Sequence, residues 1–181
     1  MNESAQLFDR NAPLQIADQG VFHVGGHYVD TTSGKIMAGQ MFVQYQIPAK
    51  KTQPYPVVMI HGGGQTGVNF LGTPDGRRGW ADYFVANGYA VYVVDQPGRG
   101  RSGFFAAAYG ESAIRGPASV AERFTAPERA KLWPQAGLHT QWPGDGVAGD
   151  AMFDHFFATQ VESMNDVGDR KSTRLNSSHR L

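Results

Sequence analysis

Two continuous apolar runs and the segment between them predict a strand-helix-strand unit. Val57 to Ile60 and Tyr89 to Val94 are rich in valine, a pattern typical of strands buried on both faces of a parallel sheet. Between them, Trp80 to Asn87 has the spacing of a short amphipathic helix, and Gly88 is a plausible C-terminal stop. The apolar positions of that helix are Trp80, Tyr83, Phe84 and Val85. A strand, a helix and a strand in this order predict a parallel sheet.

The preceding residues predict antiparallel strands. Val21 to Val24 and His27 to Val29 are β-prone runs on either side of Gly25 and Gly26, which predicts a hairpin or a bulge at the glycines. Met41 to Ile47 alternates apolar and polar residues, as a half-exposed strand does, and Pro48 follows it.

The second half of the chain has a weaker pattern. The T-x-x-E sequence from Thr125 to Glu128 predicts a capping box and a helix that reaches about Leu132. Residues 133–149 predict a loop, after which Asp150 caps a helix over residues 151–161. One face of that helix is apolar and carries Met152, Phe153, Phe156 and Phe157.

Composition excludes several classes of function. The formal net charge is 0 and the pI about 7.0, so nothing indicates nucleic-acid binding. No apolar run approaches the roughly 20 residues of a membrane helix. The absence of cysteine excludes disulfides and thiol nucleophiles. The first ten residues have no secretory signal pattern, which predicts a cytoplasmic protein, or a secreted one if a signal was lost upstream.

The glycine-rich segment after the first apolar run carries the candidate chemistry. A phosphate-binding P-loop needs Lys and then Ser or Thr after its last glycine. Gly62 and Gly67 have the P-loop spacing, but Val68 and Asn69 follow. A P-loop is therefore excluded.

A dinucleotide-binding site is the stronger rival. Gly62-x-Gly64-x-x-Gly67 matches the G-x-G-x-x-G fingerprint, and Asp95 ends the next strand, where a ribose-binding acid would lie. The fingerprint requires a helix to begin inside the motif, however. Further glycines and a proline keep this chain irregular until Trp80. A dinucleotide-binding oxidoreductase is therefore the less favoured interpretation.

The favoured interpretation is an oxyanion hole. Acyl transfer places negative charge on an oxygen, which preorganised backbone N–H groups stabilise. His61–Gly62–Gly63–Gly64 is an H-G-G-G sequence directly after a strand, and glycine lets the backbone approach a substrate closely. We expect the backbone of Gly62, Gly63 and Gly64 to form the hole and the His61 ring to support the loop.

Three sequence blocks strengthen this interpretation. They are H-G-x-x-x-T-G at His61 to Gly67, T-P-D-G-R-x-G-W at Thr73 to Trp80, and V-x-D-x-x-G-R-G-R-S at Val93 to Ser102. In this order the blocks resemble a bacterial esterase-like branch of the α/β-hydrolase superfamily. The resemblance implies an α/β fold whose first strands are antiparallel and whose later strands form a parallel unit. It implies a small-molecule ester substrate, and neither a cofactor nor a metal.

The nucleophile, acid and base of such an enzyme are missing from the chain. The resemblance implies a Ser in a G-x-S-x-G turn after the fifth strand, then an acid and a His, and no G-x-S-x-G sequence is present. Ser102 comes nearest but follows the fourth strand, so we expect a turn residue. We expect Asp95 to hydrogen-bond within that turn, and Asp75 and Arg77 to order the T-P-D-G-R loop.

The end of the chain explains this gap. Asp169 to His179 resembles the translation of a common sequencing-adapter oligonucleotide, codon by codon. We therefore expect residues 1–167 to be the N-terminal part of one α/β-hydrolase domain with an incomplete sheet, residues 104–149 to be a lid or insertion, and residues 168–181 to be a non-native or disordered tail. The parent protein would be a serine hydrolase and this chain inactive. A non-catalytic α/β-hydrolase-like binding protein is the alternative.

Overall fold

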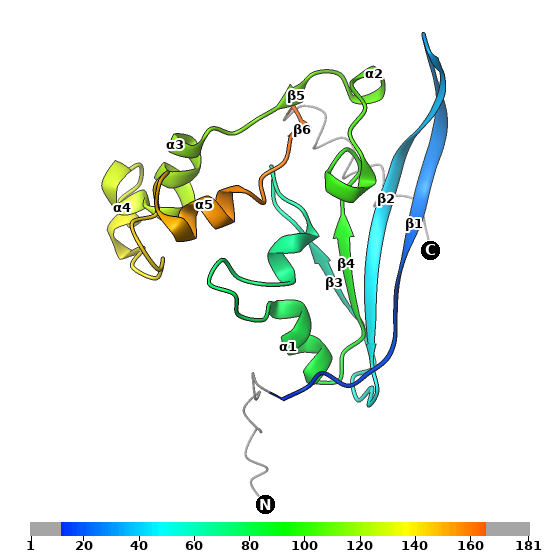
Figure 1. Cartoon of the computed structure of the whole chain (residues 1–181), viewed down its shortest axis with the longest axis horizontal. Coiled ribbons are helices and arrows are strands. Elements are labelled where there is room, and N and C mark those ends of the chain that lie inside the picture. Colours follow the sequence, from blue (N-terminus) through cyan, green and yellow to red (C-terminus); the bar gives the residue numbers. More distant parts are fainter. Residues whose placement is uncertain (1–11, 166–181) are drawn as a thin grey trace, which may run out of the picture.

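The computed structural model of the protein describes residues 12–165. They contain a four-stranded mixed sheet in the order β1-β2-β4-β3, with helix α1 packed against it (Figure 1). The strands are β1 Ile16–Thr31, β2 Gly34–Pro48, β3 Val57–Ile60 and β4 Val91–Asp95. The predicted α/β class, antiparallel first and parallel afterwards, is confirmed. The expected tail over residues 168–181 lies outside the described residues.

Strands β1 and β2 form one long antiparallel hairpin. The prediction of a hairpin or bulge at Gly25 and Gly26 is wrong, because β1 continues through both glycines with φ of +68° and +93° and no change of register. The turn comes later, at residues 32–33, where the Thr31 hydroxyl donates to the Gly34 carbonyl at 2.6 Å. Gly34 has a φ of +114°, a conformation that glycine adopts at little cost, so the chain reverses there.

The predicted strand-helix-strand unit is confirmed. Strand β3, helix α1 (Trp80–Ala86) and β4 follow one another, and β3 pairs with β4 in parallel from Val57–Val91 to Ile60–Val94. The helix ends as predicted at Gly88, whose φ is +82° and whose N–H donates to the Val85 carbonyl at 3.0 Å.

Burial of this unit differs from the prediction in two places. Strand β3 is not buried on both faces: Met59 is 5% exposed, but Val58 is 56% and Ile60 58% exposed. The reason is that β3 is an edge strand of the described sheet. On α1, Ala81 and Val85 face the core, while two of the aromatic residues expected to be apolar contacts, Trp80 and Tyr83, are exposed.

The second half of the described chain consists of short elements. They are α2 Ala106–Tyr109, β5 Ser112–Ala113, α3 Pro117–Val120, η3 Ala121–Thr125, α4 Pro127–Ala130, η4 Ala136–Leu138, α5 Ala151–Phe157 and β6 Ser163–Met164. Two short helical turns precede them, η1 Gly67–Phe70 after β3 and η2 Gly100–Ser102 after β4. Strands β5 and β6 pair with each other in antiparallel fashion.

Two helix predictions in this half meet different outcomes. The capping box at Thr125 is wrong: the Thr125 hydroxyl donates instead to the Gly146 carbonyl at 2.6 Å, and α4 ends at Ala130 because Lys131 turns left-handed with a φ of +52°. The cap at Asp150 is confirmed, since its carboxylate accepts from the Met152 N–H at 3.1 Å. Helix α5 then ends at Phe157, earlier than predicted.

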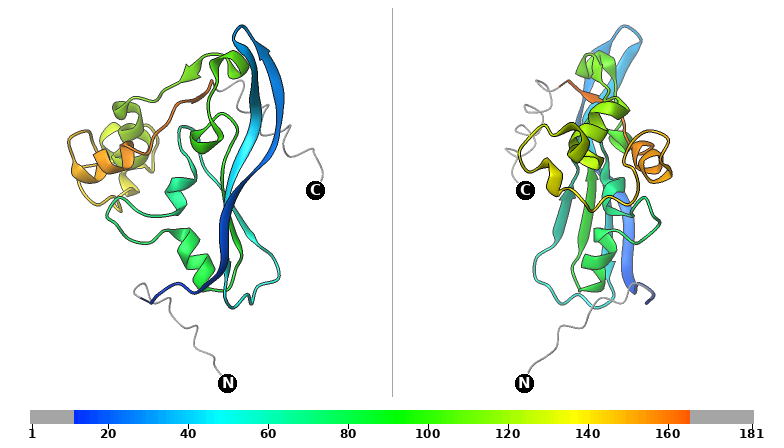
Figure 2. Two further views of the ribbon diagram at one scale, coloured as in Figure 1. Left: turned by 45° about the vertical axis from the view of Figure 1, so that its right-hand side comes forward. Right: turned by 90° about the vertical axis from the view of Figure 1, so that its left-hand side faces the viewer.

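The apolar residues form two separate clusters. The first lies between α1 and the sheet and contains Met59, Ala81, Val85, Val91 and Val93. The second contains Val120, Ala121 and Phe153, with Trp142, Val147, Phe156 and Phe157 packed around them. Helices α3 and α5 thus share a small core of their own, on the side of β3 that is remote from the β1–β2 hairpin (Figures 1 and 2).

Candidate active site

The glycine turn leaves the carboxyl end of β3 and is held by His61. This side chain is 4% exposed. Its Nε2 accepts from the Gln96 backbone N–H at 2.9 Å, and its Nδ1 lies 2.8 Å from the Gly62 carbonyl oxygen. Because Nε2 is an acceptor, the proton of the neutral ring is on Nδ1 and is donated to Gly62. The Gln96 side chain also donates to the His61 carbonyl at 3.0 Å. The ring and the backbone carbonyl of His61 thus both bind Gln96, which follows β4, and connect the turn to the end of that strand.

The turn contains backbone N–H groups without an acceptor among residues 12–165. Gly62 and Gly63 are exposed, and their N–H groups have no hydrogen-bond acceptor in the part of the chain that the structure describes. Gly64 is buried with a φ of +73°, and its carbonyl accepts from the Val161 N–H at 2.9 Å. One end of the turn is therefore fixed by His61 and the other by the segment that follows α5.

Neither exposed glycine is required by the fold. A Cβ on Gly62 would lie 3.6 Å from the Gln65 side chain, an ordinary contact, and one on Gly63 would lie 3.4 Å from Arg115 Nη2. Neither residue has a left-handed φ. Gly67 differs, because its Cβ would lie 2.5 Å from Val93 Cγ1. Packing thus explains Gly67 but not Gly62 and Gly63.

Asp95 anchors the base of the site. Its carboxylate accepts from the Gly67 N–H at 2.7 Å, the Arg101 N–H at 2.9 Å and the Arg101 guanidinium at 2.8 and 3.0 Å. Burial raises the pKa of Asp95, but the hydrogen bonds from Arg101 and Gly67 outweigh it and hold that pKa below its ordinary value. These oxygens are engaged by the protein's own donors, which argues against a ribose-binding role.

The helix start required by the dinucleotide interpretation is also missing. The four-residue turn η1 begins at Gly67, and the first α-helix after β3 begins at Trp80. A pyrophosphate near Gly62 would therefore not meet the N-terminus of a helix.

Ser102 lies in the interior. It is 1% exposed; its Oγ donates to the Asp95 carbonyl and accepts from the Phe42 N–H at 2.8 Å. These bonds fasten the turn after β4 to β2. Both capacities of the hydroxyl are used, as expected of a structural turn residue.

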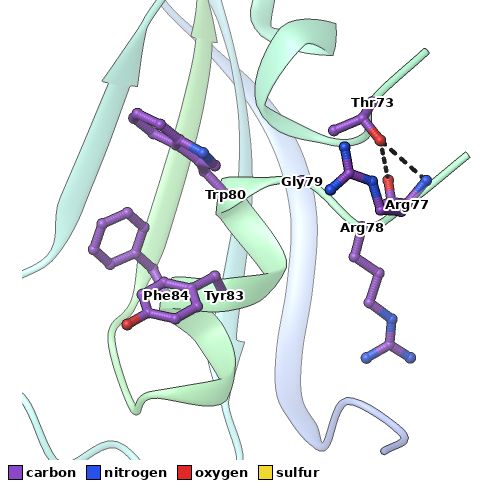
Figure 3. A pocket seen from close by; sticks show the side chains of 7 residues that line it. All are labelled: Thr73, Arg77, Arg78, Gly79, Trp80, Tyr83 and Phe84. Carbon is purple, nitrogen blue, oxygen red and sulfur yellow. Dashed lines mark hydrogen bonds between the residues drawn. The ribbon is translucent and has the colours of Figure 1, made fainter. Parts of the chain in front are cut away.

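The T-P-D-G-R loop is ordered by its own side chains. The Asp75 carboxylate accepts from the Thr73 hydroxyl and from Arg77 Nε, the latter at 2.8 Å, and Thr73 also accepts from the Arg77 N–H at 3.0 Å. The guanidinium and the hydroxyl lower the pKa of Asp75 to about 2. Figure 3 shows this loop beside α1, where a pocket of about 490 Å³ is lined by Thr73, Arg77, Arg78, Gly79, Trp80, Tyr83 and Phe84. The glycine turn does not line that pocket.

A second cavity, of about 530 Å³, lies between the chain after the glycine turn and α5. Its lining is mostly apolar and comprises Val68, Asn69, Leu71, Gly72, Thr73, Pro74, Trp142, His155, Phe156 and Thr159. The His155 Nδ1 lies 2.8 Å from the Pro74 carbonyl and closes one side of it. Val68 is four residues from Gly64, and Thr159 precedes the residue that contacts Gly64, so the cavity adjoins the turn.

The other histidines do not gather into a site. His23 and His27 are exposed on β1, His139 is exposed in a loop, and His155 contacts Pro74. Within residues 12–165 no three His, Asp or Glu side chains come together as metal ligands would. None of the helices in the same range is long and apolar enough to cross a membrane.

Two residues beside the turn escaped the sequence analysis. Side-chain atoms of Arg115 and Gln160 lie within 4 Å of the position that a Cβ on Gly64 would take. They are 51 and 96 residues away from it along the chain and belong to no motif. Only the folding of the second half of the chain over the carboxyl end of β3 brings them there.

Comparison with known proteins agrees with this geometry. No protein-family model matches the chain. It is 43% identical over 158 residues to the probable secreted lipase phiG of Fungal sp. (strain ATCC 74256), and resembles the structure of a novel bacterial esterase with a TM-score of 0.67 and 31% identity. The chain belongs to the α/β-hydrolase superfamily.

This α/β-hydrolase chain matches only part of its relatives. The alignment covers 86% of the chain and 41% of the lipase, and 84% of the chain and 52% of the esterase structure. The strand order β1-β2-β4-β3 and the glycine turn after β3 therefore belong to a fold that is longer in both relatives.

Proposed function

We propose that the protein to which this chain belongs is a serine hydrolase that cleaves carboxylic esters of small molecules. The observation that carries the proposal is a pair of exposed glycines, Gly62 and Gly63, whose N–H groups have no acceptor among the described residues and whose positions the fold itself does not reserve for glycine. A site that needs the backbone close to a reacting oxygen does demand it. The names of the two relatives, a lipase and an esterase, support the same class.

Gly62, Gly63 and Gly64 would supply one side of the oxyanion hole. When a serine attacks the ester carbonyl, its oxygen becomes negative, and each preorganised N–H donor lowers the barrier by roughly 2.7–4 kcal/mol. His61 contributes by holding the turn: its Nδ1–H donates to Gly62 while Nε2 accepts from Gln96. With both ring nitrogens engaged, His61 positions the donors and does not move the proton of the nucleophile.

The nucleophile, the acid and the base would come from outside residues 12–165. No G-x-S-x-G sequence occurs in the chain, and Ser102 is buried. The shares of the relatives that the chain covers, 41% and 52%, support this interpretation. We accordingly propose that the chain as given is inactive.

We further infer that residues 104–149, together with α5, form a lid or insertion over the acyl site. Three observations support this. The segment and α5 share an apolar cluster around Phe153, Arg115 Nη2 lies 3.4 Å from the position that a Cβ on Gly63 would take, and Trp142 lines the 530 Å³ cavity. An apolar cavity next to the oxyanion donors suits the hydrocarbon part of an ester.

The deciding experiment uses the complete protein, meaning a natural chain that contains residues 12–165. Its source DNA is read past Val167 from adapter-trimmed data, and the expressed protein is treated with a fluorophosphonate, which labels activated serines. We expect one labelled serine in a G-x-S-x-G sequence beyond residue 165, and hydrolysis of p-nitrophenyl acetate. Ser102→Ala is the matched control, and we expect it to keep both the fluorophosphonate labelling and the hydrolysis of p-nitrophenyl acetate.

Two results would overturn the proposal. A genuine stop codon just after Val167, with no labelling, would favour a non-catalytic binding protein of the same fold. Saturable NAD(H) binding by the complete protein would favour the dinucleotide interpretation instead.

A further inference from the structure

An arginine from the second half of the chain lies directly against the glycine turn. Arg115 Nη2 lies 3.4 Å from the position that a Cβ on Gly63 would take, and Arg115 Cδ and Nε lie 3.6 and 3.9 Å from that position on Gly64. Gln160 Oε1 lies 3.3 Å from the same point on Gly64. Two side chains, Arg115 just after β5 and Gln160 just before β6, thus border the turn whose Gly62 and Gly63 N–H groups have no acceptor among the described residues.

The charge of Arg115 has no partner among residues 12–165. Its side chain is half-buried and makes no hydrogen bond or ion pair in the part of the chain that the structure describes. Other arginines of the chain do have carboxylate partners: Arg77 pairs with Asp75, Arg101 with Asp95, and Arg129 with Asp145. The Arg115 guanidinium, which no carboxylate of the described residues engages, is available to an anionic group of a ligand.

Arg115 is the charged donor at this turn. The Gln160 atom that lies against Gly64 is Oε1, an acceptor, and its Nε2 is covered by the protein and so is out of reach of a ligand in this structure. The donors beside the proposed reaction site are therefore the Gly62 and Gly63 N–H groups and the guanidinium, and the described residues place no carboxylate against Arg115.

We propose that the substrate of this site is an ester whose acyl part carries a carboxylate, and that Arg115 binds this carboxylate. A planar guanidinium fork matches the two oxygens of a carboxylate. This inference rests on the proposed ester hydrolysis and adds the substrate class to it. Because the guanidinium stands directly beside the turn, the carboxylate lies a short spacer away from the ester carbonyl, as in a half-ester of a short dicarboxylic acid. Water cleaves that ester to the dicarboxylate and the alcohol.

The test compares two esters of equal chain length on the complete protein. Monoethyl succinate carries the carboxylate and ethyl butyrate does not; hydrolysis of both is followed by proton release in a pH-stat. In Arg115→Met we expect kcat/KM for monoethyl succinate to fall about 10- to 100-fold, the range for a lost hydrogen bond to a charged group, while the value for ethyl butyrate changes less than about threefold. Arg115→Lys keeps the charge without the fork and recovers part of the loss.

Arg123→Met is the matched control, because Arg123 is an exposed arginine of the same segment. We expect Arg123→Met to leave kcat/KM for both esters unchanged. Equal losses on the two esters in Arg115→Met would overturn the proposal, since Arg115 would then merely position the turn. Equal rates in wild type and variant would overturn it as well.

A binding measurement separates this proposal from the proposed function. Succinate is titrated calorimetrically into the complete protein, with no hydrolysis required. We expect wild type and Arg123→Met to bind succinate, and Arg115→Met to bind it at least about tenfold more weakly.

The outcomes distinguish the two proposals. If neither ester is hydrolysed but succinate binds through Arg115, the proposed ester hydrolysis is wrong while the carboxylate site stands. If wild type does not bind succinate, the carboxylate site fails whatever the ester rates. Should Arg115→Met unfold, Arg115→Gln and Arg115→Lys take its place, and unchanged succinate binding in both would overturn the proposal.

Discussion

The Asp95 carboxylate and the Arg101 guanidinium form a two-pronged ion pair, with Nε–Oδ2 at 2.8 Å and Nη2–Oδ1 at 3.0 Å. Asp95 is fully buried at the end of β4, whereas Arg101 is one-third exposed and lies over the Phe42 ring, 4.1 Å from its centroid. The same carboxylate accepts from the Gly67 N–H. One buried acid therefore fixes both loops that flank the proposed active site.

Asp95→Asn removes the charge and half of the acceptors while keeping the shape. Breaking a buried ion pair costs about 3–5 kcal/mol, and the partial exposure of Arg101 reduces this to about 2 kcal/mol. Urea unfolding of the complete protein measures the change. Asp75→Asn is the matched control, because Asp75 also pairs with an arginine but at the surface. If Asp75→Asn lowered the free energy of unfolding as much as Asp95→Asn, the larger role given to the buried Asp95–Arg101 pair would be contradicted.

The same pair makes stability depend on acid pH. The pKa of Asp95 is lower in the folded protein than in an unfolded chain, where an aspartate titrates at about 3.9. The contribution of the Asp95 charge to the free energy of unfolding is therefore complete above that pH and is lost as the pH falls through the folded-state pKa of Asp95. We expect the difference in unfolding free energy between wild type and Asp95→Asn to be constant from pH 7 to about pH 5 and to narrow below about pH 4. Urea titrations at a series of pH values check this, and a difference that widens in acid would refute it.

Gly79 is required by close backbone packing. A Cβ there would lie 2.1 Å from the Phe70 carbonyl oxygen and 2.6 Å from the Leu71 carbonyl carbon. Because backbone atoms cannot yield as a side chain does, we expect Gly79→Ala to destabilise the protein by about 3 kcal/mol, the upper end for overpacking. Gly137→Ala is the control, since a Cβ at Gly137 meets nothing within 4 Å. Its effect is expected to stay within about 0.5 kcal/mol; thermal or urea unfolding of the two variants decides.

His61→Phe tests the support of the glycine turn. The ring keeps its approximate volume but loses the contacts to Gly62 and Gln96. We expect the complete protein to fold, and kcat for p-nitrophenyl acetate to fall about 10- to 100-fold because the oxyanion donors are misplaced. His139→Phe, at an exposed loop position, serves for comparison and leaves kcat unchanged. An active His61→Phe enzyme would show that the ring is dispensable.

The uncovered face of β3 predicts how the chain behaves by itself. Val58 and Ile60 are more than half exposed on an edge strand of the described sheet. Exposed apolar edges template aggregation, so we expect the 181-residue chain to be poorly soluble and to lack esterase activity. Replacing both residues by threonine should raise the soluble fraction after expression, whereas Val21→Thr, exposed on β1, should change it less. A soluble monomer that hydrolyses p-nitrophenyl acetate above background would refute the expectation.

Local patterns were sufficient for several elements. The valine runs, the helix between them and its stop at Gly88 follow from periodicity and backbone preference alone, and each lies where it was predicted. The Asp150 cap depends on neighbours only two residues away and also formed. Where the physics is local, the sequence contains the information needed.

Predictions failed where a distant partner competed with the local one. The Thr125 hydroxyl bonds to Gly146, 21 residues away, in preference to the helix that follows it. Gly25 and Gly26 stay inside a strand because β2 pairs along the whole length of β1 and holds the register. Burial of β3 was overestimated because burial depends on what covers a strand, which the strand's own residues do not state.

The sequence by itself determined the class of this protein and the place of its glycine turn, because a strand followed by H-G-G-G is written in contiguous residues. Tertiary structure alone decided what surrounds that turn. His61 hydrogen-bonds to Gln96, 35 residues away, Gly64 hydrogen-bonds to Val161, and Arg115 lies beside Gly63 with no carboxylate partner among residues 12–165. Such contacts depend on how the whole chain packs at the carboxyl end of β3, and no spacing along the sequence encodes them.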